Sequence, residues 1–366
     1  MLHQLKTLKT VKALTILTIA SISVLSCKKT NSNEPQHNPD DNTADGQAMT
    51  TFMASHAPQF ESFTIDASAG GSITSSKGTK YTIPAGVFQT AAGASVTGNV
   101  NVDIKEIGSP SEMVFGDKPT LTRDGRMLLS YGEFFVRAAQ GNQQLQLKKD
   151  SAIKVQVRAK PNGQEIPMWD GDSTVTQTLN GYDYLNVAAT LSFQTRVHTG
   201  IQWDQLNASY AFFNGSNGTL DFRLDSLAQW RNCDAILNNG ATPKTTVLGY
   251  FTTHYNIQTS TDYAGEQPTM LFFKPKYQNT LIKFYNTILN APTGFQGLLS
   301  YQASVPVGME GTFLAMSTID GKFYADMKDV TIAAPTGLNN YVTLSFDPQE
   351  VSESTMVSLI TQLNSK

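Results

Sequence analysis

Residues 96–104, which read Val96-Thr97-Gly98-Asn99-Val100-Asn101-Val102-Asp103-Ile104, carry the pattern that decides the fold. Val100, Val102 and Ile104 alternate with polar residues, and this two-residue period is typical of a strand with one buried face. Further short apolar runs follow at 128–138, 144–147 and 153–157. Gly-Asn, Asp-Gly and Lys-Gly dipeptides, which favour turns, separate them. No stretch here keeps a helical period over ten positions, so this part of the chain is predicted to be a β-sandwich.

A second set of candidate strands begins near Pro243 and covers 246–252, 268–274, 280–285, 298–305, 311–317, 322–327, 330–332 and 341–346. Asp320-Gly321 between two apolar runs is a strong hairpin signal. The apolar residues of a short helix at the C-terminus share one face: Met356, Leu359, Ile360 and Leu363. Ser352 or Ser354 is expected to be its N-cap. The predicted fold class is therefore mainly β, with two β-sandwich domains in tandem and a short C-terminal helix.

Residues 1–26 have the layout of a secretory signal, with three Lys near the N-terminus and an apolar core at 13–25. A core of this length falls short of the roughly 20 residues that span a bilayer. The stretch that follows, Val24-Leu25-Ser26-Cys27, resembles the lipobox of bacterial lipoproteins, although Leu25 is bulkier than the residue usual there. The resemblance implies cleavage before Cys27 and acylation of Cys27 with chains such as palmitate. An ordinary signal peptide with a chance Cys, or an uncleaved anchor, are the alternatives.

Several acyl chains on Cys27 would hold the protein stably on a membrane, since one chain alone binds only marginally. Lys28 stands where many lipoproteins of the inner membrane carry Asp, so the outer membrane is favoured, and its periplasmic and surface faces both stay open. The polar run at 28–48 is expected to be a disordered stalk. A short helix or capping segment is expected at 47–60. Asn232-Cys233-Asp234 is similar to a segment of lipoproteins of the Bacteroidota.

Two further motifs resemble the ZU5 domain family over about residues 61–158. Gly70-Gly71-Ser72-Ile73 is similar to its Gly-Gly strand start, and Ile83-Pro84-Ala85-Gly86-Val87 to its Ile-Pro-x-Gly-Ala turn, with Val87 in place of the usual Ala. Ser130-Tyr131-Gly132 matches a later strand. The resemblance implies a protein-interaction module. The His-Phe-Ser site at which some ZU5 proteins cleave themselves is absent from the sequence.

The sequence thus divides into six parts. They are a signal peptide (1–26), a lipid-anchored flexible linker (27–59), a ZU5-like β-sandwich (60–160), a Trp-containing connecting β region (161–240), a second β-sandwich (241–347) and the C-terminal helix (348–366).

Charge and motif content narrow the function. Removing the signal leaves 24 basic against 30 acidic residues, a net charge of about −6 that disfavours nucleic acid and anionic lipid head groups. The sequence contains no metal-binding spacing, P-loop, dinucleotide fingerprint or nucleophile elbow, so we expect no metal and no cofactor. Asp170-Gly171-Asp172 is interpreted as a strand end with a turn, in preference to the start of a calcium loop. Cys233 is expected to be a buried apolar residue.

The favoured hypothesis is a non-catalytic lipoprotein of the cell envelope that presents its β domains to a protein or glycan. Trp169, Trp203 and Trp230 are the candidate binding aromatics, because rigid rings give large contact areas. A buried core position is the commoner fate of a Trp. The alternatives are a secreted polysaccharide-active hydrolase, whose paired carboxylates the fold would bring together, and a purely structural envelope component.

Overall fold

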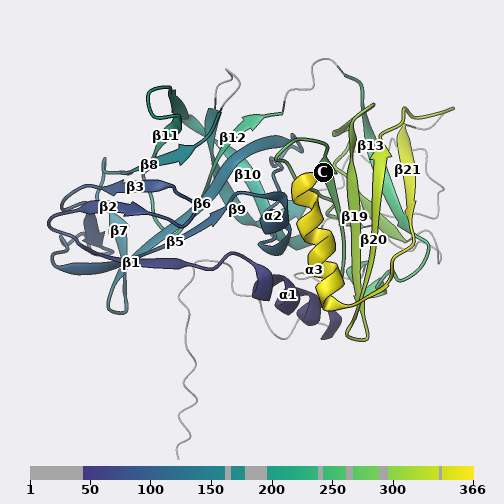
Figure 1. Cartoon of the computed structure of the whole chain (residues 1–366), viewed down its shortest axis with the longest axis horizontal. Helices are drawn as coiled ribbons and strands as arrows, with labels where there is room; N and C mark the ends of the chain where they lie inside the picture. The colour runs from purple at the N-terminus through teal and green to yellow at the C-terminus, as the bar shows by residue number, and fades with distance from the viewer. Residues whose placement is uncertain are drawn as a thin grey trace, which may run out of the picture. The chain divides into compact units, whose positions relative to one another are not determined.

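The computed structural model describes residues 44–160, 166–177, 196–237, 242–260, 267–287, 296–337 and 340–366 (Figure 1). All of them belong to one compact unit, Asn33–Lys366. The fold is mainly β, with 53% of the residues in strands. Cys27 and the predicted signal lie outside the described residues. Within the described ranges, every helix is too short or too polar to span a membrane.

The largest sheet is antiparallel and follows the path β1-β5-β6-β12-β9-β10-β11-β8-β3-β2, with β7 paired to β6 and β4 paired to β7. In chain order its strands are β1 (Glu61–Asp66), β2 (Gly71–Thr74), β3 (Lys80–Ile83), β4 (Phe88–Thr90), β5 (Asn99–Ile107), β6 (Leu128–Gln140), β7 (Gln143–Leu147), β8 (Ile153–Arg158), β9 (Ile166–Gln177), β10 (Arg196–Asn214), β11 (Thr219–Leu224) and β12 (Trp230–Ile236).

The two ends of this sheet approach each other, so that it forms a nearly closed, barrel-like structure. Glu61, the first residue of β1, accepts hydrogen bonds from the backbone N–H (2.8 Å) and the hydroxyl (2.7 Å) of Ser76, in the turn after β2. A Cβ on Gly71 would lie 3.7 Å from Ile65 of β1. The inward side chains, among them Val100, Val102 and Ile104 of the stretch that decides the fold, fill the enclosed core.

Two smaller sheets follow. One has the order β16-β17-β13-β18 with β21 parallel to β13, and the other has the order β15-β14-β19-β20-β22. Their strands are β13 (Lys244–Phe251), β14 (Thr269–Pro275), β15 (Ile282–Lys283), β16 (Asn286–Thr287), β17 (Gly297–Leu299), β18 (Val305–Pro306), β19 (Glu310–Ile319), β20 (Lys322–Thr331), β21 (Tyr341–Phe346) and β22 (Gln349–Val351). The sheets share a core in which Gly249 of β13 is so close to Leu271 of β14 that a Cβ would overlap it.

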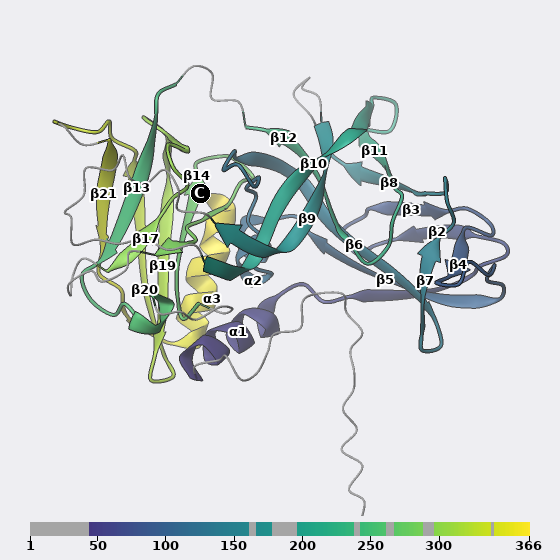
Figure 2. The same ribbon diagram turned by 180° about the vertical axis from the view of Figure 1, so that it is seen from behind.

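Three α-helices lie beside a further core between the large sheet and β14, β19 and β20. They are α1 (Ala44–His56), α2 (Pro110–Phe115) and α3 (Glu353–Gln362), and Figures 1 and 2 show α1 and α3 close to β19 and β20. Met53, Val114 and Met356 each contribute a buried side chain to this core. The short 3-10 helices Ile257–Ser260 and Leu363–Ser365 complete the elements.

Several local predictions are confirmed. The helix expected at 47–60 is α1, but it begins at Ala44 and buries Met49 and Met53, so residues 44–56 are not the disordered stalk or flexible linker that the sequence predicts there. The C-terminal helix is α3, and the hydroxyl of Ser352 caps it by accepting from the backbone N–H of Thr355. Asp320 and Gly321 both have positive φ and join β19 to β20. Helix α2 was not predicted, although Ser109 and Glu112 form the capping box that marks such a start.

The Asp-Gly turn predicted at 170–171 is wrong. Gly171 lies in the middle of β9, opposite Trp203 of β10 and Trp230 of β12. A Cβ on Gly171 would lie 2.5 Å from Ile201 and 2.8 Å from atoms of both Trp residues. Glycine is required here because bulky neighbours cover the strand, not because the chain turns.

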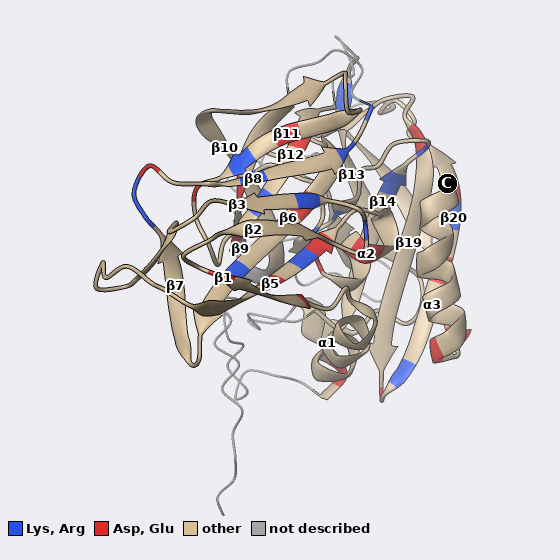
Figure 3. Ribbon diagram, turned by 60° about the vertical axis from the view of Figure 1, so that its left-hand side comes forward, with Lys and Arg blue, Asp and Glu red and all other residues tan. Residues whose placement is uncertain are grey.

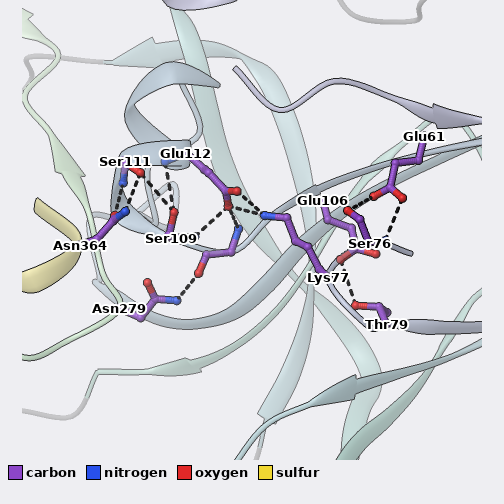
Figure 4. Close-up of polar contacts among 11 residues, drawn as sticks. Glu61, Ser76, Lys77, Thr79, Glu106, Ser109, Ser111, Glu112, Asn279 and Asn364 are labelled. Carbon is purple, nitrogen blue, oxygen red and sulfur yellow. Dashed lines mark hydrogen bonds and ion pairs between the residues drawn. The ribbon is translucent and has the colours of Figure 1, made fainter. Parts of the chain in front are cut away.

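A seam of hydrogen bonds joins the last third of the chain to the large sheet (Figure 4). The Asn279 amide donates to the carbonyl oxygens of Gly108 at 3.0 Å and Ser130 at 2.9 Å. The Asn364 side chain accepts from the backbone N–H of Ser111 and donates to its hydroxyl, both at 2.9 Å. These bonds are directional, so they fix the position of the C-terminal segments against α2 and β6.

Candidate functional site

The three candidate aromatics come from neighbouring strands and are buried. Trp169 and Trp203 have no exposed surface and Trp230 is 3% exposed. The Trp169 indole N–H donates to the carbonyl oxygen of Asp234, and that of Trp203 to the carbonyl oxygen of Pro119, both at 2.9 Å. In this structure the rings therefore serve as core, and none of them presents a free face to a ligand.

Trp169 and Trp203 nevertheless form the floor of a surface depression of about 320 Å³. Its other lining residues are polar: Thr122, Arg123, Asp124, Arg126, Asp204 and Gln205. The rim comes from the turn 122–126, which is attached to β10 because Arg123 donates its backbone N–H to the carbonyl oxygen of Trp203 at 3.2 Å. Gly125, at φ +81°, allows the turn to close.

Arg123 is the organising cation of this depression. Its guanidinium binds both carboxylate oxygens of Asp204, with Nε at 3.1 Å from each and Nη2 at 2.8 Å from one. It also donates to Asp172 at 3.0 Å and to the Gln202 side-chain oxygen at 3.2 Å. The hydrogen bond with Asp204, more than the opposing effect of burial, raises the pKa of Arg123 above its ordinary value. The arginine therefore stays charged and holds three acceptors in fixed positions.

Arg126 covers the aromatic floor. Its guanidinium lies 6.0 Å from the ring centre of Trp169 and pairs with Asp124 at 2.9 Å. The Arg126 side chain is 40% exposed and that of Asp124 62%. Exposed ion pairs contribute little to stability, so moving Arg126 away from Trp169 would cost little.

These groups suit recognition of a sugar. Planar guanidinium, carboxylate and amide groups can pair with neighbouring hydroxyls, and the ring of Trp169 could meet the C–H groups of a pyranose only after Arg126 has moved away from it. Two arginines among Asp124, Asp172 and Asp204 leave a local charge of about −1, which favours an uncharged ligand over an anion.

A second polar cluster, formed by residues of β6 and β12, is buried beneath the seam. Glu133 and Asp234 have no exposed surface. Asp234 accepts from the hydroxyl of Ser130, the amide of Asn232 and the backbone N–H of Tyr131. Neither carboxyl oxygen of Glu133 has a hydrogen-bond partner among the described residues, and neither does the Asn232 side-chain oxygen. Asn232 lies directly opposite Glu133, so a protonated Glu133 has an acceptor within reach.

Burial sets the protonation of this cluster. It raises the pKa of Glu133 well above its ordinary value, with the nearby charge of Asp234 adding to the effect. It also raises the pKa of Asp234 to about 7, against the effect of its three hydrogen bonds. The pair resembles the raised carboxylates of a hydrolase in its pKa values, yet both acids are sealed from solvent. A substrate has no access to them in this conformation.

The remaining predicted residues are structural. Cys233 is a free, fully buried thiol, as expected, and burial raises its pKa well above the ordinary value, which keeps it unreactive. Asp170 pairs with Arg231, and Asp172 with Arg123, so neither is available as part of a calcium loop. Among the residues that the structure describes, no cluster of His, Cys, Asp or Glu could hold a metal ion.

Sequence reasoning selected the floor of the depression and missed its rim. The Asp124-Gly125 dipeptide is a local turn signal that places Arg123 and Arg126 close together. No local signal links Arg123 to Asp204, which is 81 positions further along the chain. Comparison with known proteins adds no candidate, since no protein-family model, curated protein or solved structure matches the chain.

Proposed function

We propose that the protein is a non-catalytic lipoprotein of the bacterial outer membrane that binds an uncharged glycan in the depression around Arg123. The observation that carries the glycan proposal is this depression, where paired planar polar groups surround a tryptophan floor. The lipobox at Val24–Cys27 supports the membrane tether. The finer fold proposal, two β domains in tandem with the first ZU5-like, is supported by the core inside the large sheet and the core between the two smaller sheets, which a third core joins.

The packing of the first ZU5-like motif against the second supports a structural role for both. The backbone N–H of Gly86 donates to the carbonyl oxygen of Ala67 at 2.7 Å, and Gly70 lies against the backbone of Ile83 to Ala85. On this proposal the motifs hold the scaffold, while the ligand binds elsewhere.

Glycan binding is tested with Asp204→Asn. The substitution keeps the shape of the side chain and removes the charge that holds Arg123, and we expect at least a tenfold loss of affinity for neutral oligosaccharides that the parent protein binds on an array. Stability should fall by no more than about 1 kcal/mol, because the pair is half exposed. Affinity is measured by titration calorimetry.

Glu350→Gln, which breaks the exposed pair with Lys322 far along the chain, is the matched control and should leave affinity unchanged. Equal affinity of both variants, or no neutral oligosaccharide bound by the parent protein, would overturn the glycan proposal. If the protein releases reducing ends from a bound polysaccharide, it is catalytic, which would overturn the non-catalytic part of the proposal and favour the hydrolase alternative.

The tether is tested separately. Cys27→Ser removes the acylated thiol, so we expect the protein to move from the membrane pellet to the soluble fraction or to remain unprocessed. Cys233→Ala, which removes the other cysteine and leaves Cys27 in place, should stay in the pellet. A Cys27→Ser protein of mature size that still sediments with membranes contradicts a lipid anchor.

A further inference from the structure

A separate face of the large sheet carries four cations in register. Along β3, β8 and β11, every second residue packs into the core, and the residues between them lie on the outer face of the sheet. These outer residues are Lys80, Thr82, Lys154, Gln156, Arg158, Thr219, Asp221 and Arg223. Register places Lys154 directly opposite Arg223, Lys80 opposite Gln156, and Arg158 opposite Thr219. Figure 3 shows these three strands side by side with their charged positions coloured.

The charges of this face do not cancel internally. Asp221 is the one acid in the set, and it pairs with Lys154 at 3.1 Å. Asp221 also accepts from Thr219 at 2.7 Å and from Gln156 at 3.0 and 3.1 Å, and these bonds outweigh burial and lower its pKa. Within the described residues no ion pair involves the other three cations: Lys80, Arg158 and Arg223. The face therefore has a net charge of about +3 on a chain that is acidic as a whole.

This arrangement costs stability, because like charges directly opposite each other on neighbouring strands repel. Lys154 and Arg223 are such a pair, and Asp221 offsets only one of them. An anionic ligand would remove this cost. Arginine and lysine side chains on a pleated sheet project in parallel rows, so they can meet several anionic groups of one polymer at once.

An exposed aromatic ring stands at the end of the cross-strand row that Lys80, Gln156 and Asp221 form. Phe212 of β10 lies opposite Asp221 and is 70% exposed. Its neighbour Phe213 is 51% exposed although it points to the other face, so this end of the β10–β11 hairpin projects into solvent on both sides. Phe212 thus adds an apolar surface for a sugar ring beside the cations.

We propose that this face binds a segment of an acidic polysaccharide, one that carries carboxylate or sulfate groups. Lys80, Arg158 and Arg223 would neutralise the anionic groups, and Phe212 would pack on a sugar ring. A narrow polymer meets only the basic strands. An anionic membrane would face a larger part of the molecule, whose sequence has a net charge of −3, and this favours the polymer. The proposal concerns a surface separate from the Arg123 depression and does not depend on it.

The test uses the full-length protein and polygalacturonate, a polymer of uronic acid, in about 50 mM salt. We expect the parent protein to bind it, and the triple variant Lys80→Gln/Arg158→Gln/Arg223→Gln to lose at least tenfold in affinity. The three side chains are exposed, so thermal unfolding should change little. Raising the salt to about 500 mM should weaken binding of the parent protein strongly and that of the variant weakly.

The matched control changes the net charge by the same amount on the C-terminal sheets, with Lys244→Gln/Lys276→Gln/Lys322→Gln. It should keep the affinity for polygalacturonate. Equal losses in both triple variants would show a general charge effect and overturn the proposal, as would no binding by the parent protein. Stronger binding to vesicles containing phosphatidylglycerol, lost only in the first variant, would assign the face to a membrane and also overturn it. Neutral oligosaccharide binding should be the same in both variants, which separates this test from that of the depression.

Discussion

Gly70→Ala is expected to destabilise the protein by at least about 4 kcal/mol, at the upper end of single-residue effects. Gly70 has φ +69°, and a Cβ at this position would overlap the Ile83 carbonyl oxygen and lie 2.7 Å from the backbone nitrogen of Ala85. These are backbone atoms, so no side-chain rotation can relieve the overlap. The start of β2 and the turn that follows β3 would have to separate.

Gly78→Ala is the matched control, because Gly78 has φ +83° and no atom within 4 Å of an added Cβ. It should lose only the about 1–2 kcal/mol that a left-handed residue costs. Urea unfolding followed by circular dichroism measures both values. Equal losses would mean that the close approach of the two motifs contributes nothing, and that φ alone requires glycine at Gly70.

The sequence predicts strands well where one strand face is buried without interruption. Val100, Val102 and Ile104 alternate with polar residues over the first part of β5, up to Ile104, and the pairing of β5 with β1 and β6 follows without a shift in register. Strand β10 is longer and was not predicted over most of its length. Its register against β9 shifts between Thr199 and Gln202 and again between Gln205 and Tyr210, so its apolar residues lose the two-residue period.

Tertiary packing overrode the turn signal of Asp170-Gly171 in the middle of the chain. Asp170-Gly171 has the composition of a turn, while Asp320-Gly321 has the same composition and forms one. The difference lies in what surrounds the glycine. Trp203 and Trp230 occupy the space over Gly171, and these residues come from strands whose pairing no local pattern reveals.

The same limit applies to the candidate site. The sequence indicates that Trp169 and Trp203 are large aromatics, but their burial depends on the strands that flank β9 and β10. The rim depends on the ion pair of Arg123 with Asp204, which only the folded chain brings together. The sequence therefore offered the candidate aromatics, and the fold shows which polar residues lie around Trp169 and Trp203.

The free energy of unfolding is expected to fall by about 3–5 kcal/mol as the pH rises from about 5 to about 7. In the unfolded chain Glu133 and Asp234 ionise near pH 4. In the folded protein burial raises the pKa of Asp234 to about 7 and the pKa of Glu133 well above its ordinary value, so both carboxyl groups stay protonated to a higher pH. Unfolding in this window releases protons, so a higher pH favours the unfolded state. Each group contributes up to about 1.4 kcal/mol per pH unit.

Other shifted groups act outside this window. The pKa values of Asp124, Asp221 and Asp329 are lowered, so their contribution to stability is complete above about pH 4. Burial lowers the pKa of Lys274 to about 8. This shift makes the folded protein more stable as the pH rises, but only above about pH 8. The slope between pH 5 and pH 7 therefore reports the buried pair.

Glu133→Gln tests the assignment, because the amide keeps the size of the side chain and does not titrate. We expect the variant to lose about half of the slope and to gain stability at pH 7, where the parent protein bears the cost of a buried carboxyl group. Glu310→Gln, at a side chain that is 56% exposed, should keep the parent slope. Urea unfolding at a series of pH values gives the three slopes. A parent stability that stays level or rises from pH 5 to pH 7 would show that water or a counter-ion reaches Glu133, and with it that the buried cluster of β6 and β12 is open to solvent.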